Sequence, residues 1–175
     1  LRFDAAAAAT ITLSGLNTLS AGGILVTPNV GNNLTTITGG NLQGAASADL
    51  VVHQHNTANE LALASILQDN TAATALTKSG AGKLTVSGPN TYTGATYVNA
   101  GTLRVQHATG LGTIAGGVTV ARAGTVELDG GITVGNEPMS LYGTLSNPAG
   151  TNTYGGSVSL QTGSILDVGT DAMLI

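Results

Sequence analysis

Hydrophobic and polar residues alternate along much of the chain. Leu103 and Val105 flank Arg104, and the same arrangement places Glu127 between two aliphatic residues. Successive residues of a β-strand point to opposite sides, so this pattern predicts strands that bury aliphatic side chains and expose charged ones. Glycines and asparagines interrupt the alternation, as expected of tight corners between short strands. The pattern therefore predicts an all-β protein.

The aliphatic positions recur at a nearly constant spacing. One series comprises Leu84, Leu103, Val126, Leu145 and Ile165. A second series, with the same spacing, comprises Val98, Val120, Leu141 and Leu160. Two interleaved series with one period are expected when a chain returns to the same face once per coil. We therefore predict a single-stranded parallel β-helix, with about 20 residues per coil and about eight coils.

A short corner motif repeats as well. Residues 90–92 (Asn-Thr-Tyr) return at 152–154, and a weaker copy of 86–92 occupies 13–19. We predict that Tyr92 and Tyr154 pack within the corners and do not stack on a ligand.

Residues 59–69 (NELALASILQD) allow two interpretations. Asn59 could cap an amphipathic helix. Leu61 and Leu63 also fit a strand, and Leu63 precedes Leu84 by about one period of the aliphatic series. We predict a strand and a corner here, and the coil boundaries between residues 45 and 75 stay open.

Composition narrows the class of protein. Charged residues make up 8% of the chain, hydrophobic residues 42%, and the net charge is −4. This combination favours regular β-structure, because disordered chains combine low hydrophobicity with high net charge. The five basic residues form no patch that could neutralise a nucleic-acid backbone. There is no cysteine for a disulfide or a thiolate metal site, and no apolar run reaches the roughly 18 residues of a membrane helix.

The sequence begins and stops within its repeating pattern, without a visible secretion signal. We therefore expect one β-helix domain over residues 1–175, as an internal fragment of a longer protein.

The most regular stretch covers residues 76–105, which read as a strand, a turn, a strand, a turn and a third strand. Its characteristic residues are Leu76-Thr77-Lys78-Ser79-Gly80, Gly82, Leu84-Thr85-Val86-Ser87-Gly88, Asn90-Thr91-Tyr92-Thr93-Gly94, Thr96, Val98 and Gly101-Thr102-Leu103. These residues resemble the passenger-associated, or autotransporter-associated, β-strand repeat. The resemblance implies a right-handed parallel β-helix in the passenger region of a protein secreted by Gram-negative-type bacteria.

In that family an outer-membrane translocator barrel, which is not in this chain, exports the passenger to the cell surface. The resemblance thus implies a non-enzymatic structural stalk that is extracellular and supports export, folding and display of adhesive modules. The alternative is a binding module whose face recognises glycan, matrix, a host surface or another copy of the chain. Ice-binding and polysaccharide-acting β-helices are weaker alternatives.

Two histidines have a spacing that can bind zinc. His53 and His55 would lie on one side of a strand, but a tetrahedral site needs further ligands. The nearby acids that could supply one are Asp49, Glu60 and Asp69. The favoured interpretation is a solvated pair on the outer face, and His107 gives no signal of its own.

Catalysis on polysaccharides requires carboxylates that converge on one groove. The acids considered in the second half are Asp129, Glu137, Asp167 and Asp171. None of them shows a paired spacing, Asp129 reads as part of a turn, and no Gly-x-Ser-x-Gly elbow frames a nucleophile. We therefore predict no catalytic residue, no cofactor and no metal site.

Two outward-facing features remain. Arg104 and Glu127 occupy equivalent positions on adjacent coils, which predicts an exposed ion pair worth at most about 1 kcal/mol. Thr-x-Thr occurs at residues 10–12, 36–38 and 91–93, copies that are too few and too irregular for a continuous ice-binding array.

Overall fold

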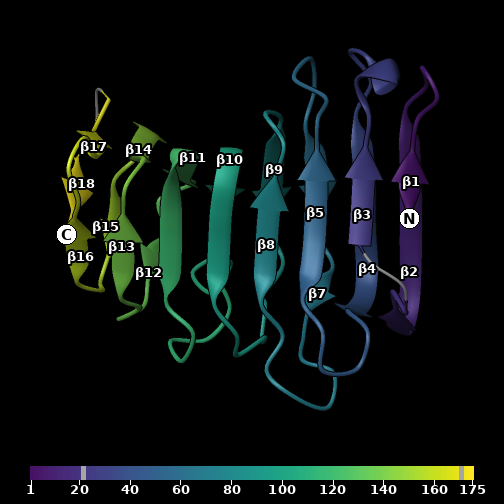
Figure 1. The fold of residues 1–175 in the computed structure, drawn as a ribbon, viewed down its shortest axis with the longest axis horizontal. Helices are drawn as coiled ribbons and strands as arrows, with labels where there is room; N and C mark the ends of the chain where they lie inside the picture. The colour runs from purple at the N-terminus through teal and green to yellow at the C-terminus, as the bar shows by residue number, and fades with distance from the viewer. Residues whose placement is uncertain (21–22, 170–171) are drawn as a thin grey trace.

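The chain winds into one elongated stack of parallel strands (Figure 1). The computed structural model describes residues 1–20, 23–169 and 172–175. The two termini lie at opposite ends of the stack, and the described part makes about seven turns. The predicted all-β parallel solenoid is confirmed. Parallel crossovers are right-handed in nearly all proteins, which is the hand expected here. No described segment is a helix long and apolar enough to span a membrane.

The strands form three faces along the stack. The first face contains β1 (Arg2–Phe3), β3 (Gly23–Val26), β5 (Leu50–Gln54), β8 (Leu76–Ser79), β13 (Met139–Leu141) and β16 (Val158–Leu160), with the first parts of β10 (Thr96–Val105) and β11 (Val118–Asp129). The second contains β6 (Leu61–Leu63), β9 (Lys83–Val86), β14 (Thr144–Ala149) and β17 (Ile165–Asp167), with the first parts of β2 (Ala9–Thr18) and β4 (Thr35–Gln43) and the second parts of β10 and β11. β7 (Ile66–Leu67) lies beyond the corner that follows β6 and pairs with the last part of β4.

The third face is less regular. It contains β12 (Thr133–Val134), β15 (Asn152–Tyr154) and β18 (Met173–Leu174), while a short 3-10 helix, η1 (Pro28–Val30), follows β3. Because β10 and β11 run through a corner, the first and second faces join into one sheet of 15 strands over the described residues. Towards the C-terminus the third face is a separate sheet of three strands, β12-β15-β18, whereas nearer the N-terminus β7 and the last parts of β2 and β4 occupy this side.

The interior consists of vertical columns of aliphatic side chains. On the second face Leu84 pairs with Leu103, Leu103 with Val126, and Val126 with Leu145. All four side chains are 0% exposed. On the first face the predicted series Val98, Val120, Leu141 and Leu160 is likewise in register. The predicted vertical stacking is therefore confirmed by residue-to-residue pairing.

The coil length differs between the two halves of the chain. After β8, the sequence separation between partners on successive coils stays close to the predicted period. For most pairs before β8 it is larger, as between Leu25 and His53 and between Ile37 and Leu63. Those N-terminal coils are longer because their corners carry extra residues. The mean is about 23 residues per coil, so the estimate of eight coils is corrected to about seven.

Two register assignments need correction. Leu145 pairs with Leu166, not with Ile165, because the last coil is one residue longer than the series implies. Residues 59–69 contain strands β6 and β7, so the strand interpretation is correct and the helix interpretation is wrong. The partner of Leu84, however, is Leu61 and not Leu63.

The repeated Asn-Thr-Tyr motif closes corners from within. The Asn90 side chain accepts a hydrogen bond from the Leu67 backbone N–H (2.9 Å) and donates one to the Gly110 carbonyl (2.8 Å). These partners lie on the preceding and following coils, so one buried amide satisfies backbone groups that no strand pairs. Tyr92 and Tyr154 are at most 1% exposed, which confirms their predicted packing role.

One glycine shows why a side chain is not tolerated at a corner. Gly101 has φ of +68°, and a Cβ built on it would lie 2.5 Å from the carbonyl oxygens of Gly80 and Gly82. The turn in β10 therefore needs both the left-handed conformation and the close approach of the preceding coil.

We predict that Leu103→Ala lowers the free energy of unfolding by about 3 kcal/mol, because it leaves a cavity in a filled column. Thr102→Ala, on the neighbouring and partly exposed position, should change it by about 0.5 kcal/mol or less. Urea unfolding followed by circular dichroism measures both. Equal effects at the two positions would contradict the column.

We also predict that Asn90→Ala costs about 2 kcal/mol or more, since it leaves a buried N–H and a buried carbonyl without partners. The matched control is Asn99→Ala, which removes an exposed amide and should be nearly neutral. A similar loss of stability in both variants would show that the corner amide has no special role.

Candidate functional site

A charge cluster, defined as Glu60, Lys83, Arg104, Glu127 and Asp129, lies on the outer side of the second face. Arg104 Nε and Lys83 Nζ each lie 3.0 Å from Glu127 Oε2. Glu60 and Asp129 lie 3.9 Å from the Arg104 guanidinium. The register pairs Arg104 with Glu127 directly, so the predicted ion pair between adjacent coils is confirmed. The predicted exposure is corrected, because the two side chains are 27% and 16% exposed and the pair is therefore half-buried.

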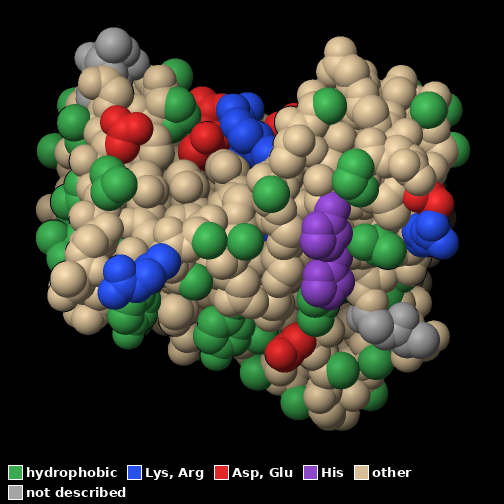
Figure 2. Space-filling model, turned by 45° about the horizontal axis from the view of Figure 1, so that its top comes forward, with side chains coloured by type: hydrophobic (Ala, Val, Ile, Leu, Met, Phe, Trp, Pro, Cys, Tyr) green, Lys and Arg blue, Asp and Glu red, His purple; other side chains and the backbone are tan. Residues whose placement is uncertain are grey.

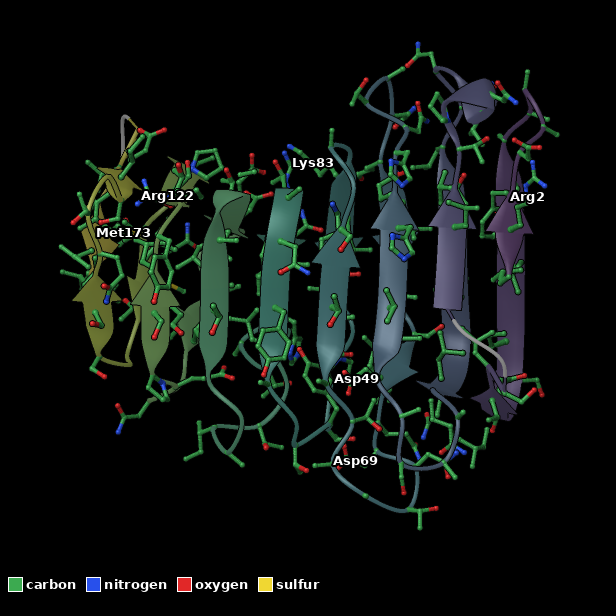
Figure 3. The ribbon with its side chains drawn as sticks, viewed as in Figure 1. Arg2, Asp49, Asp69, Lys83, Arg122 and Met173 are labelled. Atoms are coloured by element: carbon green, nitrogen blue, oxygen red, sulfur yellow. The ribbon has the colours of Figure 1, made fainter. Side chains whose placement is uncertain are left out.

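The cluster connects coils and leaves no free acid. Lys83 bonds Glu127 two coils away, and Thr85 Oγ1 donates a hydrogen bond to Glu60 Oε2 (2.7 Å). Acidic and basic side chains lie side by side in a notch on the molecular surface in Figure 2, and Figure 3 labels Lys83 at this upper edge. Because each carboxylate lies near a cation, the cluster is better suited to holding successive coils together than to transferring protons.

The two histidines form a surface pair. The imidazole rings of His53 and His55 are stacked, with centroids 6.1 Å apart and an interplanar angle of 5°. Both side chains are exposed and visible next to each other in Figure 2. The described residues contain no group of three or more His, Cys, Asp or Glu that could hold a metal ion.

Two of the acids considered as zinc ligands, Asp49 and Asp69, accept hydrogen bonds from the backbone instead, and the third, Glu60, belongs to the charge cluster. Asp69 Oδ1 accepts hydrogen bonds from the backbone N–H groups of Thr74 (2.8 Å) and Thr93 (3.0 Å), and Asp49 Oδ1 accepts one from Ala75 (3.4 Å). Burial alone would raise the pKa of Asp69, but the hydrogen bonds outweigh it and lower the pKa. Figure 3 places both acids at the lower corners, opposite Lys83.

The acids considered for catalysis do not meet. Asp129 accepts a hydrogen bond from Gln106 (2.9 Å), and exposed Asp167 accepts one from Ser146 (3.4 Å). Glu137 is buried on another side of the solenoid, and Asp171 lies outside the described residues. No hydrogen bond or ion pair between described side chains joins Asp129, Glu137 and Asp167.

A buried lysine was missed by the rule that charges face outward. Lys78 occupies an interior column between Val52 and Val98 and is 0% exposed. Its Nζ donates to the carbonyls of Ser79 (3.2 Å), Gly80 (2.7 Å) and Ala100 (2.9 Å). Burial lowers its pKa to about 8. The sequence did contain a signal for this position: Leu76 points inward, and in a strand the residue two positions later, Lys78, points to the same side.

A groove of about 440 Å³ opens beside the third face. Thr113 N–H bonds back to the Tyr92 carbonyl (2.9 Å), whereas β12 pairs only with β15 on the following coil. No backbone hydrogen bond between described residues joins 109–115 to 132–136, so the sheet is interrupted here. The groove is lined by Pro89, Asn90, Thr91, His107, Ala108, Thr109, Gly112, Thr113, Ile114, Gly135 and Glu137.

Unsatisfied polar atoms gather around this interruption. Thr113 Oγ1, Glu137 Oε1 and Tyr154 OH are three of the five buried side-chain N and O atoms that lack a hydrogen-bond partner among the described residues. Burial raises the pKa of Glu137 to about 7, and the Gly117 backbone N–H opposes this by bonding the carboxylate. Burial, assisted by the negative charge of Glu137, also raises the pKa of Tyr154.

The pKa of Glu137 predicts a pH dependence of stability. Because folding raises this pKa from 4.5 to about 7, the unfolded chain releases the proton first, and the free energy of unfolding should fall as pH rises between these values. Glu137→Gln should remove this fall.

The measurement is the difference in free energy of unfolding between wild type and Glu137→Gln, taken from pH 4 to pH 8. Titratable groups that are unchanged between the two proteins largely cancel in this difference, so its pH dependence reports on Glu137. A difference that stays constant with pH would contradict the prediction.

Comparison with known proteins identifies residues 76–105, the most regular stretch of the sequence. Residues 76–105 match the model of the passenger-associated-transport-repeat. The chain carries a passenger-associated-transport-repeat. These are the bounds expected from the sequence. The repeat spans β8, β9 and β10, and β8 and β9 both pair with β10, so it is a coil stacked on the start of the next.

A relative extends the similarity beyond the repeat. Over 133 residues, or 75% of this chain, the sequence is 33% identical to the protein named Adhesin BmaC autotransporter from Brucella suis biovar 1 (strain 1330). The matched part is 4% of that protein's length, so the chain corresponds to a small portion of it. No solved structure matches the chain significantly.

Proposed function

We propose that this chain is a non-enzymatic structural segment of a surface-displayed autotransporter passenger. It acts as a stalk that supports export, folding and display of adhesive modules. The observation that carries the proposal is the unbroken column of buried side chains from Leu61 through Leu84, Leu103 and Val126 to Leu145. Such a column makes adjacent coils one rigid body and leaves the outer faces free to vary.

The export role follows from the order of contacts. Each described coil pairs with the coils immediately before and after it, so a coil can fold as soon as its neighbour has folded. The partner implied is an outer-membrane translocator barrel, and the location is the extracellular side of a Gram-negative-type outer membrane. Both the passenger repeat and the similarity to a protein named as an adhesin autotransporter support this assignment.

The second candidate is a binding module. It is favoured by the interrupted third face, which provides a groove with unsatisfied acceptors. An ice-binding face is less well supported. Thr10 and Thr12 do pair in register with Thr36 and Thr38, but the next coil brings Ala62 opposite Thr36 and ends the array.

A replacement experiment separates the stalk from the binding module. In a passenger that carries this chain, residues 1–175 are replaced by an unrelated β-solenoid of equal length, and display and adhesion are measured on intact cells. The stalk proposal predicts that both are retained. Normal display with adhesion lost would favour the binding module.

A point variant tests the folding contribution in the same cells. Leu103→Asp places a charge in the buried column and should lower the amount of passenger at the surface several-fold, because a buried unpaired charge is strongly destabilising. Thr119→Asp, on a partly exposed position of β11, is the matched control. Equal display of the two variants would contradict folding-assisted export.

A further inference from the structure

The groove beside the third face combines an apolar lining with two unsatisfied oxygen atoms. Pro89, Ala108 and Ile114 contribute apolar side chains, and Ile114 is 63% exposed. Thr113 and Glu137 lie in the same lining, and each has a buried oxygen without a hydrogen-bond partner. A buried acceptor without a donor costs free energy, so an incoming donor would recover that cost.

The charges around the groove favour a cation. Glu137 is 2% exposed, and no lysine or arginine is among the residues that line the groove. Lys83 and Arg104 are already committed to Glu127 in the charge cluster. A neutral ligand would leave the carboxylate's charge uncompensated, whereas an ammonium group would form a charge-assisted hydrogen bond.

The geometry favours lysine over arginine. Oε1 is the oxygen of Glu137 that is buried without a hydrogen-bond partner. A planar guanidinium is best satisfied by two carboxylate oxygens, whereas a compact ammonium needs one and can also donate to a hydroxyl such as Thr113 Oγ1. The methylenes of a lysine side chain would cover the apolar lining while its charged end reaches the acceptors.

We propose that this groove is a docking site for a lysine side chain of a partner protein, with Glu137 as its counter-ion and Thr113 as a second acceptor. The site does not depend on the stalk role. A structural stalk does not need such a groove. Conversely, the groove could bind lysine even if replacing residues 1–175 left adhesion unchanged.

The test uses the whole 175-residue chain and the peptide acetyl-Gly-Lys-Gly-amide, titrated by two-dimensional ¹⁵N NMR. The expected result is a saturable shift of amide signals in residues 107–114 and 135–137. Matched peptides replace lysine with arginine, Nε-acetyl-lysine or norleucine. The arginine peptide should bind more weakly than the lysine peptide, and the two uncharged peptides should bind at least about tenfold more weakly.

Variants then identify the residues. Glu137→Gln keeps the shape of the side chain and should weaken lysine-peptide binding about tenfold or more, while Thr113→Val should weaken it a few-fold. The control is Asp167→Asn, which removes an exposed acid on the second face and should leave binding unchanged. The NMR spectrum of each free variant shows whether that variant is folded. If Glu137→Gln does not fold, the binding measured with Thr113→Val tests the site.

Three results would overturn the proposal. They are equal binding of the lysine and norleucine peptides, unchanged binding in Glu137→Gln, and shifts confined to the charge cluster around Arg104. Saturable binding of a neutral oligosaccharide in the groove, with no response to the lysine peptide, would assign it to a glycan instead.

Discussion

The structure depends on the parallel register between successive coils. A short strand such as β6 or β9 cannot bury its side chains or satisfy its backbone alone, because both requirements are met by the coil above and the coil below. Leu84 shows the constraint: Leu61 and Leu103 cover it from either side, and all three are fully buried. Stability therefore arises between coils, and a fault in one coil weakens its two neighbours.

Strand pairing continues through the corner in β10 and β11, but other corner backbone groups lie outside the strands and need a different solution. Here single polar side chains replace the missing ladder. Asn90 bonds backbone groups on both neighbouring coils, and Lys78 gathers three carbonyls at a turn. Both Asn90 and Lys78 belong to the passenger-associated-transport-repeat. The sequence of the repeat therefore encodes its strands and also the polar residues that hold its corners. Retaining a buried ammonium is physically reasonable because its hydrogen bonds offset part of its desolvation.

The sequence was most informative where residues repeat at a fixed interval. Alternation gave the inward residues, because side-chain direction in a strand depends only on local geometry. The series from Val98 to Leu160 gave the register, because the coils between these residues have nearly constant length. It failed where corners vary in length: Leu63 was aligned with Leu84 in place of Leu61, and Ile165 with Leu145 in place of Leu166. It also missed the interior position of Lys78 and the groove at Glu137. A charge usually faces solvent, and an interrupted sheet leaves no local pattern in the sequence.

Pairing between successive coils explains both the regular stack and the groove. Where the third face is paired, at β12 and β15, backbone groups and side chains are covered by the next coil. Where pairing stops between Thr113 and Gly135, a groove opens on the surface, and Glu137, Thr113 and Tyr154 keep buried oxygens without hydrogen-bond partners. A solenoid can accept such an interruption because the first and second faces continue through the same coils in β10 and β11. The stack thus remains continuous on two faces while the third is interrupted between residues 113 and 135, where the groove lies.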